Sequence, residues 1–139
     1  MSELHFQPVK GRAREILKAI LSSPEVSSCH MKVALTLRLV CEEIVTNVTS
    51  YAYPEGADGF LDVDIQKTDR LVLRFTDGGV PFNPLEQQAP DINQSWKQRH
   101  IGGLGILLIR KKMDDVRYAR LGERNVLTVE KVLPASSTA

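Results

Sequence analysis

The segment SSCHMKVALTLRLVCEEIVTNVTSY, residues 27–51, decides the fold because it carries the longest regular pattern in this chain of 139 residues. Its apolar residues recur at helical spacing. They form a single stripe made of Val33, Leu37, Val40, Ile44 and Val48. Ser27 precedes the stripe and is available as an N-cap. We expect one long helix that buries this stripe.

On the N-terminal side of this segment, a strand and a shorter helix are predicted. Residues 2–8 (SELHFQP) alternate apolar and polar side chains, which is typical of a half-buried strand, and the alternation stops at Pro8. From Val9 to about Ser22 the apolar residues return at helical spacing. The short strand is expected to lie at an edge of the sheet.

On the C-terminal side, four strands and one helix are predicted around a long irregular segment. Residues 78–103 have no sustained period, and a loop of that length within a compact domain signals function or disorder. The alternating patterns and the glycine-rich turn predict strands over 60–66 and 71–77, a helix that begins in the turn 102–105, and strands over 115–121 and 125–133.

This order of elements indicates an α+β fold, a two-layer α/β sandwich with helices on one face of a mostly antiparallel, mixed sheet. The length and the 42% hydrophobic content suit a single domain. We expect it over residues 1–134, with a mobile tail over 135–139.

The charge balance and the N-terminal residues disfavour a nucleic-acid-binding, secreted or membrane-anchored protein. Lys and Arg number 18 against 17 Asp and Glu, so no overall basic charge favours nucleic acid. The first residues have no long apolar run behind a basic start, which predicts a cytoplasmic protein without a membrane anchor. Cys29 and Cys41 are expected to be free thiols.

Two polar residues on one face of the predicted long helix form the first candidate site. Glu43 and Asn47 are four residues apart, so their side chains leave the same face one turn apart. A carboxylate beside an amide oxygen suits a hard cation such as Mg²⁺, which also binds phosphate oxygens. Taken alone, the pair is explained more simply as two solvated positions.

A second polar group ends the predicted strand 71–77. Asp77 is followed by Gly78 and Gly79, and glycines let a ligand approach the backbone closely. An ionised Asp77 accepts a hydrogen bond from an exocyclic amine such as that of adenine. A plain turn with Asp in its first position explains the same residues.

A third group, Gly102-Gly103-Leu104-Gly105, stands directly before a predicted helix. Free backbone N–H groups and the positive end of a helix dipole favour a polyphosphate at such a position. No βαβ pattern surrounds the turn and no Gly-Lys-Ser/Thr follows it, so it is neither a dinucleotide fingerprint nor a P-loop.

Read together and in this order, the three groups resemble the motifs of the GHKL ATPase superfamily. EEIVTNVTSYAY (42–53) resembles its N box, TDGGVPFNP (76–84) its G1 box and GGLGILLIRKKMDDVRY (102–118) its G2 box. The forms DGGVPF and GGLGILLIRKKMD are most similar to the anti-sigma-factor serine kinases. Two departures are Tyr51, where many relatives carry His, and Pro81 in place of a second Gly, which the small anti-sigma type shares.

The resemblance implies a role for each matching residue. Glu43 would be the general base, Asn47 the Mg²⁺ ligand and Asp77 the adenine reader, with Gly79 allowing close approach of the base. Gly103 and Gly105, with Leu104 between them, would wrap the phosphates. Residues 83–101 would form a lid over ATP, and Thr128 would support the adenine pocket near Asp77.

The resemblance also implies an activity and partners. It predicts an ATP- and Mg²⁺-dependent serine/threonine-protein kinase that acts as an anti-sigma factor in a partner-switching system. Its substrate would be an anti-sigma-factor antagonist, a STAS-type protein, and it would hold a sigma factor or analogous regulator. Relatives commonly pair through the helical and N-terminal strand region, so the short edge strand over residues 2–8 leads us to expect a homodimer.

Two alternatives stay open at the level of sequence. One is a catalytically inactive ATP-binding regulatory module that sequesters a protein partner. The other is the detached ATP-binding part of a histidine kinase, which the lack of a helical phospho-acceptor segment upstream disfavours.

Overall fold

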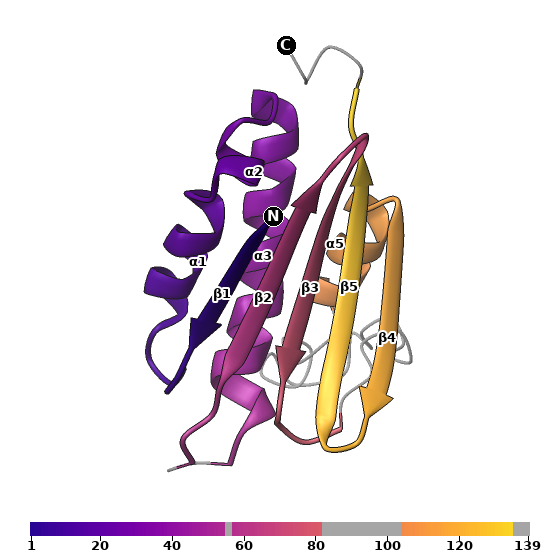
Figure 1. Ribbon diagram of the computed structural model, residues 1–139. Helices are drawn as coiled ribbons and strands as arrows, with labels where there is room; N and C mark the ends of the chain where they lie inside the picture. The colour runs from indigo at the N-terminus through magenta and orange to yellow at the C-terminus, as the bar shows by residue number, and fades with distance from the viewer. Residues whose placement is uncertain (55–56, 82–103, 135–139) are drawn as a thin grey trace.

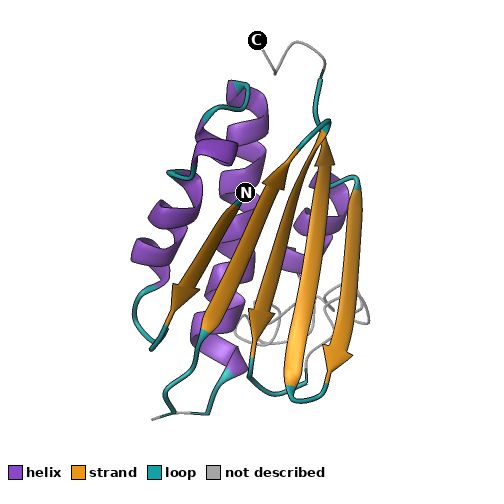
Figure 2. Ribbon diagram, in the orientation of Figure 1, coloured by secondary structure: helices purple, strands orange, loops and turns teal. Residues whose placement is uncertain are grey.

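The computed structural model describes residues 1–54, 57–81 and 104–134, and shows a five-stranded sheet covered on one face by helices (Figure 1). The elements are β1 (Ser2–Phe6), α1 (Ala13–Leu21), α2 (Pro24–Ser27), α3 (Met31–Asn47), η1 (Val48–Ala52), β2 (Leu61–Lys67), β3 (Arg70–Asp77), α5 (Leu104–Lys112), β4 (Asp115–Leu121) and β5 (Arg124–Val132). Figure 2 shows all the helices on the same side of the strands, which confirms the predicted two-layer α+β fold.

The strands lie in the order β1-β2-β3-β5-β4, and every neighbouring pair that the structure describes is antiparallel. The prediction of a mixed sheet is therefore wrong for these residues. β4 does run parallel to β3, but β5 lies between them, so no parallel hydrogen-bonded pair forms. β1 and β4 are the two edges, in agreement with the prediction for the N-terminal strand.

The segment 27–51 is less uniform than its sequence pattern predicts. The predicted apolar stripe is buried along its whole length. However, α3 begins at Met31, and its N-cap is His30, whose Nδ1 accepts a hydrogen bond from the Lys32 N–H at 3.3 Å. Ser27 instead ends the separate helix α2. At the other end, the α-helix passes at Val48 into the wider turn η1.

Both cysteines are free thiols, as the sequence predicts. Cys41 is fully buried in the core, and burial raises the pKa of its thiol to about 12. Within the described ranges, no helix has the length and apolar character needed to cross a bilayer. The predicted lid over 83–101 and the tail over 135–139 lie outside the described residues.

Candidate functional site

The end of α3, the turn η1 and the adjoining ends of β3 and β5 surround a cavity of about 160 Å³. A cavity of roughly 150 Å³ has room for a benzene-sized ring. Its walls are Asn47, Val48, Tyr51, Ala52, Asp77, Val80 and Asn125. The structure thus brings Asn47 and Asp77 together at one mostly apolar cavity, although they belong to different elements.

Glu43 and Asn47 hold different positions relative to this cavity. Asn47 lines it, whereas Glu43 lies one helical turn earlier on α3 and is half-buried outside the cavity wall. Among the described residues, neither side chain has a hydrogen-bond or ion-pair partner. The two groups are therefore available to a ligand along one side of the helix.

Asp77 is 7% exposed and uses only one of its two carboxylate oxygens within the described structure. Its Oδ1 accepts the Gly79 N–H at 2.8 Å and the Asn125 Nδ2–H at 3.0 Å. Its Oδ2 accepts no hydrogen bond from a described residue. Because buried polar atoms are nearly always paired, this oxygen calls for a donor that the described residues do not supply.

The charge state of Asp77 reflects two opposing effects. Burial raises the pKa of the carboxyl above its ordinary value. Hydrogen bonds from Asn125 and Gly79, together with the charge of Arg120, act in the opposite direction without cancelling it. The carboxylate is therefore easier to protonate than an exposed aspartate.

Asn125 is a site residue that the sequence motifs did not identify. It lies directly opposite Asp77 in the β3–β5 pair, and its Nδ2 also donates to the Val80 carbonyl at 2.8 Å. Its Oδ1 accepts hydrogen bonds from the Tyr118 hydroxyl and from Arg120 at 3.2 Å. Because its oxygen is engaged on the outer side, the amide is fixed with its nitrogen toward Asp77.

Arg120 extends this network to the glycine turn. Its Nη1 donates to the Gly79 carbonyl at 2.9 Å, in addition to its bond with Asn125. Arg120 and Tyr118 both belong to the edge strand β4, so the outermost strand supports the position of Asp77 through two side chains. No short motif signals this network, because it depends on the β4–β5–β3 register.

The structure corrects the predicted position of Thr128. Thr128 is paired with Arg74 of β3 and lies in a groove with Arg74 and Arg117 on the sheet face away from the helices. Successive residues of a strand point to opposite faces, so a residue three positions after Asn125 cannot share its face. Asn125 takes the place beside Asp77 that the resemblance gave to Thr128.

Tyr53 is a second residue that sequence reasoning missed. Its hydroxyl accepts the Gly78 N–H at 2.7 Å and the Phe60 N–H at 3.1 Å, and donates to the Phe60 carbonyl at 2.5 Å. It therefore joins the segment after η1 to the start of β2 and to the glycine turn. This bridge holds the backbone that follows Asp77 in place.

Gly79 is required by the packing of the protein itself. A Cβ at this position would lie 2.2 Å from the carbonyl oxygen of Ala52. The same carbonyl accepts the Val80 N–H at 2.8 Å, so the two backbones are joined where they meet. Close approach of η1 is therefore a reason for Gly79 that the sequence did not indicate, beside the expected close approach of a bound base.

We expect Gly79→Ala to lower both stability and ligand affinity. The clash is with backbone atoms, so relief requires η1 and the glycine turn to separate, at a cost of about 1–3 kcal/mol in the free energy of unfolding. Thermal unfolding and calorimetric titration with ATP measure the two effects. Gly122→Ala is the control: it has open space but φ of +62°, so it should cost about 1 kcal/mol and leave ATP affinity unchanged.

The third motif is only partly within the described structure. α5 begins at Leu104, so Leu104 and Gly105 are its first two residues, as the predicted helix start requires. Gly103 lies outside the described residues.

Comparison with known proteins places this geometry in a family. Residues 6–131 match the sequence profile of the histidine kinase-like ATPase domain. The chain belongs to this family. Its three motifs, first noted as a resemblance, are thus those of a histidine kinase-like ATPase domain.

Two curated relatives narrow the comparison. Serine/threonine-protein kinase BtrW of Bordetella bronchiseptica is 28% identical over 99 residues, which cover 70% of each chain. Serine-protein kinase RsbW of Listeria monocytogenes is 32% identical over 87 residues, 58% of this chain and 55% of that protein. Both relatives are named as protein kinases, the class of enzyme that the sequence motifs predict. The chain spans about half the length of the RsbW proteins that it matches.

A solved structure supports the fold. The histidine kinase domain from the blue-light activated histidine kinase of Erythrobacter litoralis EL346 superposes with a TM-score of 0.54 and 16% identity. The match covers 94% of this chain and 64% of that one. At this identity the similarity concerns the fold of the family and not the phospho-acceptor.

Proposed function

We propose that this histidine kinase-like ATPase domain is an ATP- and Mg²⁺-dependent serine/threonine-protein kinase that acts as an anti-sigma factor. The observation that carries the proposal is the buried Oδ2 of Asp77, which has no donor among the described residues and lies on a ring-sized cavity. The exocyclic amine of adenine supplies the missing donor. The apolar walls formed by Val48, Ala52 and Val80 suit the faces of the ring.

The donor set of the site fits one magnesium ion shared with phosphates. Asn47 offers a neutral amide oxygen on the cavity wall, and its side chain has no partner in the described structure. Mg²⁺ is commonly held by few protein oxygens together with phosphate oxygens and water. Bound there through Asn47, the ion would neutralise phosphate charge during transfer.

Glu43 is placed to act on the attacking hydroxyl. It lies one turn from Asn47 on the same side of α3, half-buried and without a described partner. In this proposal its carboxylate accepts the proton of a serine or threonine as the oxygen attacks the γ-phosphate. The domain over 1–134 thereby contributes the base, the Mg²⁺ ligand and the adenine reader.

The proposed substrate is an anti-sigma-factor antagonist of the STAS type, and the proposed second partner is a sigma factor or analogous regulator in the cytoplasm. The names of BtrW and RsbW support a serine or threonine acceptor. A homodimer is proposed through the edge strand β1, whose outer side pairs with no other described strand and so offers backbone groups to a second copy.

The proposal is tested by purifying each STAS-type protein encoded in the source genome and incubating it with the chain, Mg²⁺ and γ-labelled ATP. We expect one of them to acquire acid-stable label. Binding of ATP and of an antagonist without any transfer would instead establish the inactive regulatory module. Acid-labile label would indicate transfer to histidine and contradict the proposed acceptor.

A further inference from the structure

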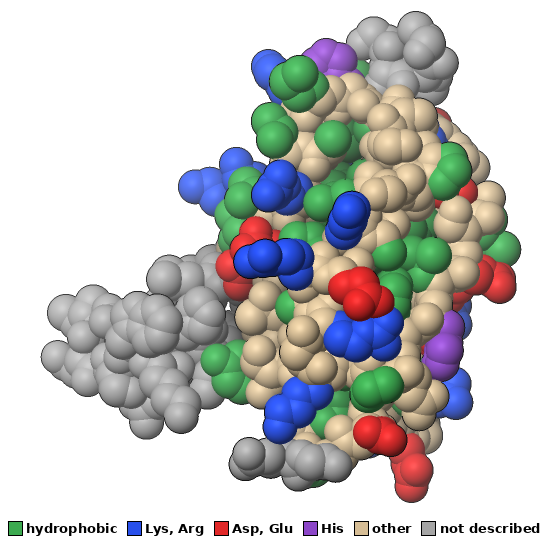
Figure 3. All heavy atoms as spheres, turned by 90° about the vertical axis from the view of Figure 1, so that its left-hand side faces the viewer, with side chains coloured by type: hydrophobic (Ala, Val, Ile, Leu, Met, Phe, Trp, Pro, Cys, Tyr) green, Lys and Arg blue, Asp and Glu red, His purple; other side chains and the backbone are tan. Residues whose placement is uncertain are grey.

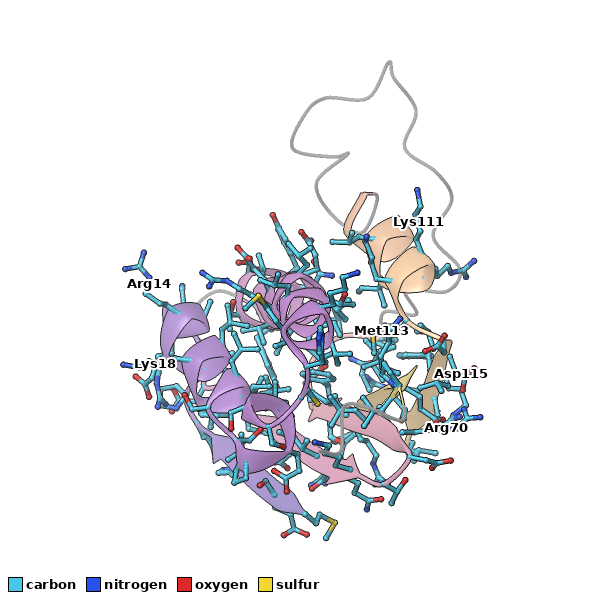
Figure 4. The ribbon with its side chains drawn as sticks, turned by 90° about the horizontal axis from the view of Figure 1, so that it is seen from above. Arg14, Lys18, Arg70, Lys111, Met113 and Asp115 are labelled. Atoms are coloured by element: carbon cyan, nitrogen blue, oxygen red, sulfur yellow. The ribbon has the colours of Figure 1, made fainter. Side chains whose placement is uncertain are left out.

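Three large apolar side chains on α3 are exposed and occupy one row. Met31 is 73% exposed, Leu35 56% and Leu39 46%. They are spaced four residues apart, so they form one i, i+4 ridge of the helix, called here the α3 ridge. The buried stripe of α3 occupies the opposite side of the helix, against the sheet. Figure 4, seen from above the view of Figure 1 and so roughly along the helix axes, shows α3 with side chains directed away from the strands.

The α3 ridge leads directly to the candidate site. The next two residues at the same spacing are Glu43 and Asn47. With a rise of 1.5 Å per residue, Leu39, Leu35 and Met31 lie about 6, 12 and 18 Å from Glu43 along the helix axis. Ridges of this kind are inclined to the axis, so the row passes from the exposed crest of α3 toward the cavity that Asn47 lines.

Positive charges border the α3 ridge. Lys32 and Arg38 are exposed on α3 itself. The last turn of α5, which packs against α3, carries the exposed cations Arg110, Lys111 and Lys112. Lys111 projects from α5 away from the sheet (Figure 4). Figure 3 faces the α1 and β1 edge of the molecule and shows basic side chains next to hydrophobic ones there. Such a surface complements apolar side chains bordered by carboxylates.

We propose that the α3 ridge is the docking surface for the protein substrate of the kinase. The substrate would place apolar side chains, bordered by Asp or Glu, on Met31, Leu35 and Leu39, and so hold its serine or threonine hydroxyl at Glu43. The inference rests on the proposed kinase function, because docking on the α3 ridge serves phosphoryl transfer only if the acceptor hydroxyl reacts at Glu43. Contacts on this remote surface would be equally strong before and during transfer, so they would strengthen substrate binding without changing the rate of the bound complex.

The test compares Leu35→Ser and Leu39→Ser with Leu121→Ser. Leu121 is a matched control, since it is 59% exposed on β4 and lies off the ridge. The substrate is the STAS-type protein that the wild-type chain labels. We expect each ridge substitution to raise KM for this protein about tenfold, with kcat, ATP affinity and thermal stability unchanged. Leu121→Ser should behave like the wild type, and an unchanged KM in both ridge variants would overturn the inference.

Failure of the kinase proposal is distinguishable from failure of the docking proposal. If no STAS-type protein is labelled, the affinity of the wild-type chain for each unlabelled protein is measured by calorimetry. A complex that Leu35→Ser and Leu39→Ser weaken about tenfold, and Leu121→Ser does not, would support the docking surface alone; no complex would overturn it. Light scattering tests whether the α3 ridge instead binds a second copy of the chain. A ridge variant that becomes monomeric while its KM for the substrate is unchanged would also overturn the docking proposal.

Discussion

Asp77→Asn is expected to weaken ATP binding about 100-fold while the fold keeps its stability. The asparagine Oδ1 keeps the hydrogen bonds from Gly79 and Asn125. Its Nδ2 takes the place of Oδ2, so an N–H group faces the N–H of the adenine amine and no hydrogen bond forms between them. The amide cannot turn over, because its nitrogen would then face both of those donors. Calorimetric titration with ATP and Mg²⁺ measures the loss.

Stability and pH separate this effect from general damage. Because the folded-state pKa of Asp77 is raised, its ionised form opposes folding at neutral pH, and that cost disappears as pH falls through the folded pKa. Asp77→Asn should therefore melt at or above the wild-type temperature at pH 7. In the wild type, ATP affinity should fall as Asp77 becomes protonated, about tenfold per pH unit below its pKa, beginning at a higher pH than for an ordinary aspartate.

Asp69→Asn is the control for this substitution, because Asp69 lies in the exposed turn at the opposite end of β3. It should leave ATP affinity and its pH dependence unchanged. If Asp77→Asn binds ATP as tightly as the wild type does, Asp77 is not the adenine reader.

Glu43→Gln is expected to abolish most phosphoryl transfer without loss of ATP binding. Removing a general base typically lowers kcat by about 10² to 10⁴. Glu43 does not line the cavity, so ATP affinity should stay within about threefold of the wild-type value. Single-turnover transfer of γ-label to the antagonist measures the rate.

Glu42→Gln supplies the matched comparison for Glu43. Glu42 is the adjacent carboxylate, but it is exposed and points to a different side of α3. Its variant should transfer phosphate at the wild-type rate. Full transfer by Glu43→Gln would remove Glu43 from the role of base.

The parts of the fold predicted from sequence are those governed by local periodicity. The buried stripe of α3 and the alternating strands β2 and β3 follow from side-chain spacing alone. The start of α3 was misplaced because Ser27 and His30 are both able to cap a helix, and the turn at α2 decides between them. The sheet was predicted as mixed because spacing does not give the order of strands.

Site residues that belong to a motif within one element could be predicted from the sequence, whereas residues that join the site through contacts between elements could not. Asn47 and Asp77 were identified from their own surroundings in the chain. The sequence favours Thr128 over Asn125 because β5 has apolar residues on both faces, Val126 on one and Leu127 on the other. Only the register of β5 with β3 shows which face joins the cavity. The hydrogen bonds of Tyr53 likewise depend on long-range contacts.

The central claim is that the cavity beside Asp77 holds the adenine of ATP. A crystal structure of the chain with a non-hydrolysable ATP analogue and Mg²⁺ tests it most directly. The exocyclic amine should lie about 2.9 Å from the Asp77 carboxylate oxygen that Gly79 and Asn125 leave free, with Asn47 at the metal. An analogue bound elsewhere, or a base whose amine points away from Asp77, would contradict the account.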